Sequence, residues 1–313
     1  MENRDFNKNF INLFIIVLGL VIFITKWYNS YFYFNEEIES KIIFESMSDG
    51  YYNFAPFKAL ANLDLNNSFS PMIDNLGTVT VPIGAYIVHF ILYKIIGTSS
   101  FILLEFFFIT IFIIIFYKIS RLLNLSRIQS LAIAILLFNI PNIFQVLNFY
   151  TLDYFTVIYS EFYTLRFPRP LVTNIIFFLF IFLILKSEKK NFFTKKNSII
   201  SGIIASLLFT SYFHAFFLQQ IVLITYVIFK FRLKTINIIK KNFKFILIYL
   251  LTFCLISLPF IINMFFADYD FLERNGVVDF NIQKKLILAE HLFLKLFKIQ
   301  FLFILFLSIL LTF

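Results

Sequence analysis

The sequence predicts an all-α integral membrane protein of about eight membrane-embedded helices, with interfacial helices in its first outer loop. Hydrophobic residues make up 60% of the chain of 313 residues, charged residues only 14%, and the mean hydropathy is +0.85. The apolar residues are gathered in runs of roughly 15 to 20 residues, close to the length that crosses the bilayer as a helix. Lysines and arginines gather between particular runs, as in short cytoplasmic loops. This composition excludes a soluble globular domain.

The clearest membrane spans are long uncharged or nearly uncharged runs. They are Phe10–Thr25, Ser99–Tyr117, Ile128–Leu147, Leu171–Leu185, Phe245–Met264 and the stretch from Ile299 to the end. The first run leads into Lys26 without a small-residue cleavage site, so we interpret residues 1–25 as an uncleaved signal anchor with a cytoplasmic N-terminus. The last run reaches Phe313 without a polar tail, and we expect a further C-terminal part.

The stretch Ile199–Phe229 is too long for one span and short for two. Basic clusters flank it on both sides, and the positive-inside rule therefore places both of its ends in the cytoplasm. A hairpin of two short helices satisfies this requirement. It would carry Tyr212, His214 and Gln219 near its tip.

The stretch Val81–Gly97 is apolar enough to span the membrane, but we place it flat in the outer interface. As a span it would move the basic residues after the next helix to the outer side, namely Lys118, Arg121 and Arg127. Tyr86, His89 and Tyr93 recur at helical spacing, which gives the polar stripe that an interfacial helix needs. We thus predict one transmembrane domain, 1–313, with an outer loop at 26–98 and a helix bundle at 99–313.

This topology places most basic residues inside and most acidic residues outside. The net charge of +9 then reflects short inner loops that orient the chain and attract anionic lipid headgroups. We therefore expect membrane lipids as partners and no nucleic acid. The single cysteine, Cys254, excludes an internal disulfide, and His89, His214 and His291 are too scattered for a histidine metal motif.

The centre of the first outer loop reads Ser48-Asp49-Gly50-Tyr51-Tyr52. A carboxylate at the membrane surface can act as a base toward a hydroxyl group, or hold a divalent cation that a phosphate-bearing substrate brings. In the alternative interpretation, Asp49 is an ordinary N-terminal cap of a helix over Tyr51–Leu60. Both interpretations stay open at this point.

Arg166 and Arg169 precede the apolar run that starts at Leu171, at the predicted outer interface. Guanidinium groups bind phosphate through paired hydrogen bonds, so we expect these residues to hold a phosphate group. The alternative is that their side chains only snorkel beside Asp153 and Glu161.

The order of these features resembles the GT-C superfamily of polytopic glycosyltransferases. The resemblance rests on one anchor span, an outer loop with Asp-Gly-Tyr-Tyr, a Pro-Ile-Gly-Ala-Tyr helix that closes on Ile-Ile-Gly, and a span that ends on Tyr-Lys-Ile-Ser-Arg. It implies transfer of a sugar from a polyprenyl-phosphate carrier on the outer side, with Asp49 as the catalytic acidic residue. Two departures are that Asp49 has no adjacent acid, which leaves a divalent cation (Mg or Mn) open, and that Glu105 stands where many relatives have an arginine.

We therefore expect a glycosyltransferase at the outer face of a bacterial-type inner membrane, acting on a lipid, glycan or protein acceptor. Asp49 is the catalytic candidate, Arg166 and Arg169 the carrier-phosphate candidates, and Tyr52, His89 and His214 further groove residues. The metal ligands stay unknown. The alternatives are a flippase, transporter or polymerase of lipid-linked glycans, which predicts functional charges inside the spans, and a non-catalytic membrane assembly protein.

Overall fold

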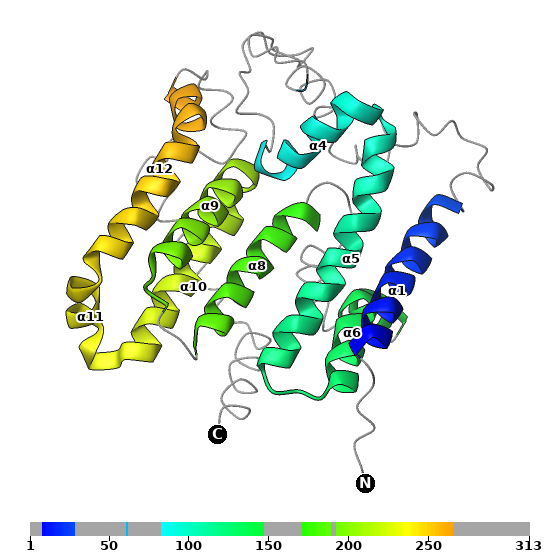
Figure 1. Ribbon diagram of the computed structural model, residues 1–313, viewed down its shortest axis with the longest axis horizontal. Coiled ribbons are helices and arrows are strands. Elements are labelled where there is room, and N and C mark those ends of the chain that lie inside the picture. Colours follow the sequence, from blue (N-terminus) through cyan, green and yellow to red (C-terminus); the bar gives the residue numbers. More distant parts are fainter. Residues whose placement is uncertain (1–7, 29–60, 62–82, 147–170, 189–191, 266–313) are drawn as a thin grey trace.

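The computed structural model describes residues 8–28, 61, 83–146, 171–188 and 192–265, and over these ranges every regular element is helical (Figure 1). The prediction of an all-α fold is therefore confirmed for the described part of the chain. The elements are, in order, α1 (Lys8–Tyr28), α4 (Ile83–Ile96), α5 (Ser99–Leu122), α6 (Arg127–Val146), α8 (Leu171–Glu188), α9 (Lys195–Ser211), α10 (Phe213–Phe231), the 3-10 helix η5 (Arg232–Lys234), α11 (Thr235–Lys241) and α12 (Phe243–Phe265).

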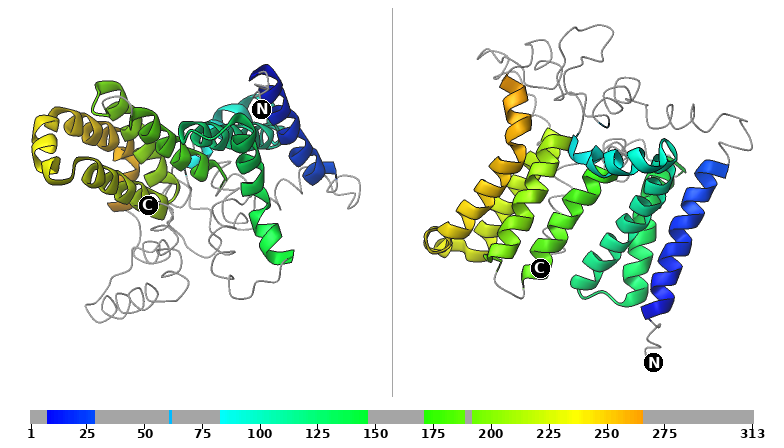
Figure 2. Two further views of the ribbon diagram at one scale, coloured as in Figure 1. Left: turned by 90° about the horizontal axis from the view of Figure 1, so that it is seen from below. Right: turned by 45° about the horizontal axis from the view of Figure 1, so that its top comes forward.

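Most of the long helices run side by side in one bundle, with two partly separate groups of contacts. Helix α5 packs against α1, α6 and α8, whereas α9 packs against α8, α10 and α12. Helix α6 leaves the α5 turn obliquely, and α4 lies across one end of the bundle between the ends of α9 and α5 (Figure 2). Helix α8 joins the two groups because it contacts both α5 and α9.

Two helices within the described ranges are long and apolar enough to cross a membrane, at Ser99–Leu122 and Phe243–Ile262. A third candidate arises if Ala215–Phe231 and Thr235–Lys241, which meet at a bend of 110°, form one broken span. Shorter apolar stretches, which do not reach this length over the described residues, lie in α1, α4, α6 and α8, at Asn9–Ile24, Ile83–Ile96, Arg127–Leu136 and Leu171–Ser187. The expected number of about eight membrane-embedded helices stays a prediction.

The described basic clusters gather at one end of the bundle, as the charge pattern predicted. The α5–α6 turn, the end of α8, the start of α9 and the α10–α12 connection all lie at the lower end in Figure 1. The end of α1, the starts of α5 and α8, and the end of α12 lie at the opposite end, together with α4. We call these the basic end and the α4 end.

The predicted helical hairpin at Ile199–Phe229 is confirmed. Helices α9 and α10 meet at Tyr212, whose extended backbone (φ −157°, ψ 108°) interrupts the helix. Both helices continue further toward the basic end than predicted. Helix α9 begins early because the Thr194 hydroxyl accepts a hydrogen bond from the Asn197 backbone N–H at 3.2 Å, which caps its first turn.

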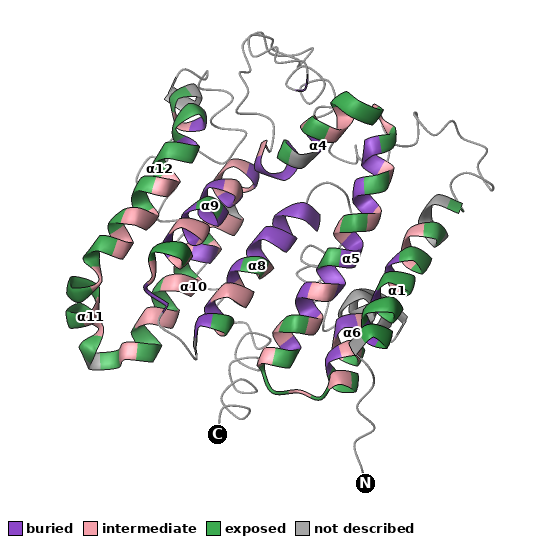
Figure 3. Ribbon diagram, in the orientation of Figure 1, coloured by how far each residue is buried: buried purple, intermediate pink, exposed green. Residues whose placement is uncertain are grey.

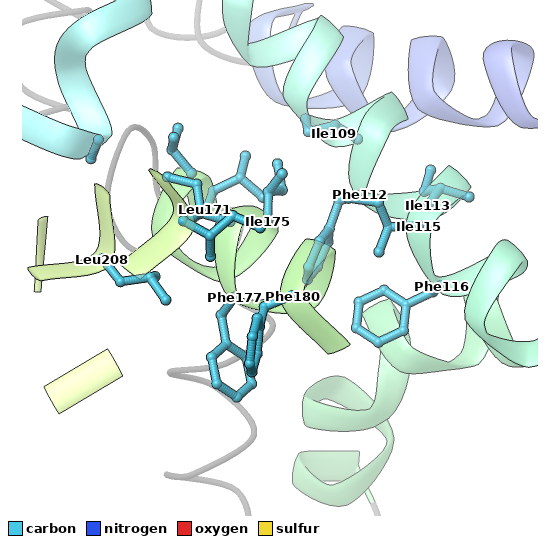
Figure 4. Close-up of a cluster of buried hydrophobic side chains, with 14 of the residues drawn as sticks. Ile109, Phe112, Ile113, Ile115, Phe116, Leu171, Ile175, Phe177, Phe180 and Leu208 are labelled. Atoms are coloured by element: carbon cyan, nitrogen blue, oxygen red, sulfur yellow. The ribbon is translucent and has the colours of Figure 1, made fainter. Parts of the chain in front are cut away.

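The core of the bundle is built by aromatic and branched side chains between α5 and α8 (Figure 4). The Phe178 ring lies 4.5 Å from that of Phe116 and 5.9 Å from that of Phe112, measured between centroids. Burial is densest on α5, α8 and α9, whereas α1 and α12 keep exposed apolar faces (Figure 3). Exposed residues of this kind, such as Leu255 at 72%, are what a lipid-facing helix surface would present.

Candidate functional site: polar residues beneath the transverse helix

The position of α4 is set by a close backbone contact with α9. Gly84 lies against the last turn of α9, where a Cβ atom would collide with the carbonyl oxygen of Leu207 and lie 2.6 Å from Oγ of Ser211. Ala85 is fully buried at the same contact. Small residues let two helices approach this closely, so the Gly84-Ala85 pair fixes the face of α4 that meets the bundle.

At its other end α4 turns directly into α5. Gly97 has a positive φ of 63°, a conformation that glycine adopts without the steric cost that a Cβ atom brings. The Gly97 N–H donates to the carbonyl of Tyr93 at 2.8 Å, which closes the last turn of α4. The chain thereby changes direction from across the bundle to along it.

His89 is completely buried on the inner face of α4. Its ring lies 5.3 Å from that of Phe101, 5.8 Å from that of Phe108 and 5.8 Å from that of Tyr86, between centroids. Burial lowers the pKa of His89 from 6.5 to about 3, although hydrogen bonds to the backbone of Ala85 and Tyr86 act in the opposite direction. The imidazole is therefore neutral at physiological pH.

We expected Tyr86, His89 and Tyr93 to form the polar stripe of an interfacial helix, and this expectation is wrong for Tyr86 and His89. Tyr86 is only 4% exposed and His89 not at all, because Gly84 brings this face of α4 against the protein. The apolar residues Ile87 and Ile91 are the exposed ones, at 45% and 65%. Apart from its last turn, where Lys94 is exposed, the helix presents apolar residues outward and Tyr86 and His89 inward.

Glu105 is the described acidic side chain nearest in sequence to this contact, and it is buried at 1% exposure. Phe101, Glu105 and Phe108 are spaced by four and three residues, so they share the face of α5 against which His89 packs. A carboxyl group inside an apolar bundle is costly to bury and often marks a functional position.

Further polar side chains are buried at the α4 end of neighbouring helices. Thr173 and Asn174 lie in the first turn of α8, Ser100 starts α5 and Ser211 ends α9. Within the described residues, the hydroxyl groups of Ser100, Thr173 and Ser211 have no hydrogen-bond partner. Buried hydroxyls are usually paired, so these three are available to a ligand or to water. With Tyr86, His89, Glu105 and Asn174 they form what we call the outer-end polar set.

Part of this set escaped the sequence analysis. Thr173 and Asn174 form a polar pair in the first turn of an otherwise apolar run, directly after Arg169 and Pro170. This polar interruption of an apolar run was the signal in the sequence that could have marked the two residues as site candidates. Their burial depends on contacts of α8 with α4 and α5, which the local sequence does not specify.

Most of the predicted site residues lie outside the described part of the chain, namely Asp49, Tyr52, Arg166 and Arg169. His214 lies in the first turn of α10, two residues after Tyr212 and thus at the α4 end, and its side chain is not described. His89 is placed in the outer-end polar set. Among the described residues, no three histidine, cysteine, aspartate or glutamate side chains are grouped to hold a metal ion.

A separate polar contact links α10 to α12. The Tyr249 hydroxyl donates to Oε1 of Gln220 at 2.9 Å, and Gln220 in turn donates to Oε1 of the fully buried Gln219 at 3.0 Å. Such interhelical hydrogen bonds hold apolar helices in a fixed register.

No family model, curated protein or solved structure matches the chain.

Proposed function

We propose that the protein is a membrane glycosyltransferase that moves a sugar from a polyprenyl-phosphate carrier to a lipid, glycan or protein acceptor at the α4 end of the bundle. The observation that carries this proposal is the transverse helix α4, which lies across the bundle and covers buried polar side chains. A lipid-linked substrate has its reactive bond at the membrane surface, and a polar site under a surface helix lies at that depth. We take this end to be the outer face of a bacterial-type inner membrane.

In this proposal Asp49 acts as the general base. Its carboxylate takes the proton from an acceptor hydroxyl, the hydroxyl oxygen forms a bond to the anomeric carbon of the donor sugar, and the bond to the carrier phosphate breaks. Arg166 and Arg169 stabilise the phosphate that leaves, because paired guanidinium hydrogen bonds suit its oxygens. In the sequence Arg169 stands two residues before Leu171, where α8 starts, and the start of α8 lies at the α4 end.

The outer-end polar set would line the sugar subsite. The hydroxyls of Ser100, Thr173 and Ser211 offer donors and acceptors, and the neutral ring of His89 lies in the same polar set. Sugar hydroxyls need several hydrogen-bond partners at once, which an otherwise apolar bundle offers only where such polar side chains gather. A divalent cation, Mg or Mn, at Asp49 stays open in this proposal.

One observation favours a second candidate, the transport of lipid-linked glycans without sugar transfer. Glu105 is a buried acidic side chain within α5, which is one of the two helices in the described part of the chain that are long and apolar enough to span the membrane. Carboxyl groups in such positions often serve ion or substrate pathways. In this candidate, Glu105 rather than Asp49 is the essential acid.

The test is sugar transfer by the purified chain in liposomes, with a panel of polyprenyl-phosphate sugars, with and without Mg or Mn. Asp49→Asn is compared with the native chain and with Asp74→Asn, a matched control in the same predicted loop. The proposal expects loss of transfer of at least about a hundredfold in Asp49→Asn and little change in the control. Transfer that survives in Asp49→Asn would refute the assignment of the base. Movement of the carrier lipid between leaflets, abolished in Glu105→Gln without any sugar transfer, would favour the second candidate.

A further inference from the structure

A cavity of about 350 Å³ lies between α9, α10, α11 and α12 at the basic end, opposite the outer-end polar set. Its volume falls within the range of ligand sites, about 300 to 1,000 Å³. The wall is almost entirely apolar. It includes Leu223 and Val227 of α10, Ile239 of α11, and Phe245, Ile246 and Leu250 of α12.

Three features of the cavity indicate what would fill it, namely its open side, a buried hydroxyl group and a basic rim. Several wall residues, among them Ile224, Ile228 and Leu250, are themselves 47 to 58% exposed, so the cavity is open to the apolar outer side of the described bundle. A flexible hydrocarbon chain from the surrounding lipid can therefore enter it sideways. An apolar chain gains free energy from contacts with the rings and branched side chains of the wall.

Four polar residues line the cavity, namely Ser198, Ser201, Thr235 and Tyr249, and Ser201 is the one with a buried hydroxyl that lacks a partner among the described residues. Ser201 is only 2% exposed. Burying a hydroxyl without a partner costs stability, because its hydrogen bonds to water are lost and not replaced. An acceptor on the ligand, such as an ester carbonyl, would remove this cost.

The rim of the cavity is strongly basic. Each wall segment at the basic end continues directly into exposed lysines or arginines. These are Lys195 and Lys196 at the start of α9, Arg232 and Lys234 before α11, Lys240 and Lys241 at its end, and Lys244 in α12. No described acidic side chain lies in these segments. Charge complementarity therefore requires an anionic group at the mouth.

We propose that this cavity binds one acyl chain of an anionic glycerophospholipid, with its phosphate at the lysine rim and an ester carbonyl near Ser201. The apolar C-terminal run of the chain itself is a poorer occupant, because residues 299–313 contain no acidic residue to neutralise the rim. Such a lipid would hold α12 against α9 and α10 at the basic end. It is separate from the proposed carrier substrate, which acts at the α4 end.

The experiment counts lipids retained on the full chain by native mass spectrometry, after purification in neutral detergent and addition of phosphatidylglycerol or phosphatidylcholine with identical acyl chains. We expect selective retention of one phosphatidylglycerol. Lys240→Gln with Lys244→Gln should weaken it about thirtyfold, since each rim lysine contributes about a factor of five. The matched control, Lys118→Gln with Arg127→Gln, removes two charges from the α5–α6 turn at the same end and should change nothing.

A photoreactive group in the acyl chain of phosphatidylglycerol shows where on the protein the lipid binds. Crosslinks to Leu223, Val227 or Leu250, lost in the cavity-filling variant Val227→Phe, would support the site. Equal retention of phosphatidylglycerol and phosphatidylcholine, an equal effect of the control pair, or crosslinks spread over α1 and α5 would overturn it. If residues 286–313 become crosslinked to cavity positions of the native chain instead, the occupant is the C-terminal segment and the proposal is wrong.

Discussion

Replacement of Gly84 by alanine tests whether the packing of α4 on α9 governs this end of the molecule. Two effects act in opposite directions. Alanine favours a helix over glycine by up to about 1 kcal/mol. Against this, the added Cβ would collide with the Leu207 carbonyl oxygen and lie 2.6 Å from Ser211 Oγ and 2.7 Å from Thr210 Oγ1.

The packing effect should be the larger one. Overpacking a close contact costs about 1 to 3 kcal/mol, and the upper value applies because a backbone carbonyl cannot rotate away as a side chain can. The net expectation for Gly84→Ala is a loss of about 2 kcal/mol, or a fall in Tm of roughly 5 °C. Helix propensity alone predicts the opposite sign, so the direction of the shift already separates the two arguments.

The assay is thermal unfolding of the purified chain in detergent, with Ile91→Ala as a control on the exposed side of α4, where Ile91 is 65% exposed. A second readout uses Tyr86→Cys in a chain whose native Cys254 is replaced by serine. Tyr86 is 4% exposed, so a bulky maleimide should label this position only after Gly84→Ala separates α4 from α9. A Tm equal to or above that of the native chain, together with unlabelled Tyr86→Cys, would refute the reasoning.

Three further predictions concern buried polar groups. Ser206→Ala should cost about 1 kcal/mol, since the Ser206 hydroxyl donates to the Phe253 carbonyl of α12 at 3.1 Å; Ser130→Ala, whose hydroxyl bonds only within its own helix, is the control in the same unfolding assay, and equal losses would contradict the interhelical role. Tyr249→Phe should cost about 1 kcal/mol through loss of the bond to Gln220, and a double-mutant cycle with Gln220→Leu should show coupling rather than additivity. The folded-state pKa of His89, about 3, lies below its unfolded value of 6.5, so its contribution is complete above pH 6.5 and declines as pH falls. The free energy of unfolding should drop by about 2 kcal/mol between pH 6.5 and pH 5. In His89→Phe, measured by thermal unfolding over the same pH range, this dependence of stability on pH should be lost. An unchanged dependence would show that other groups cause it.

Much of the helix pattern could be predicted from the sequence because apolar runs and basic clusters are local signals. The runs Ser99–Tyr117 and Leu171–Leu185 have the same first residue as α5 and α8, and only their ends extend further. The hairpin itself, with Tyr212, His214 and Gln219 near its tip, followed from the positive-inside rule, since both of its flanks are basic. The exact place of its turn was not predicted. Such features depend on the distribution of charge along the chain rather than on tertiary contacts.

The orientation of α4 could not be predicted, and the reason is physical. A polar stripe at helical spacing has the same period whether it faces water or a protein interior. The decisive contact is Gly84 against Leu207, two residues far apart in the sequence. The burial of Glu105 escaped prediction for the same reason, because it depends on which face of α5 receives α4. The predicted outer loop with Asp49, and Arg166 with Arg169, lie outside the described residues and stay predictions.

The two ends of the bundle differ in a way that bears on function. At the basic end the described charges are exposed, whereas at the α4 end the polar groups are buried. Exposed lysines cost little and serve orientation and lipid contact, but a histidine and a glutamate inside an apolar bundle are costly to bury. The hydroxyls of Ser100, Thr173 and Ser211, which have no hydrogen-bond partner among the described residues, reduce stability unless they bind something. Apolar residues of similar size at Glu105 and Thr173 would give a more stable bundle. The presence of these polar residues beneath α4 is therefore the strongest physical reason to seek the activity of the protein there.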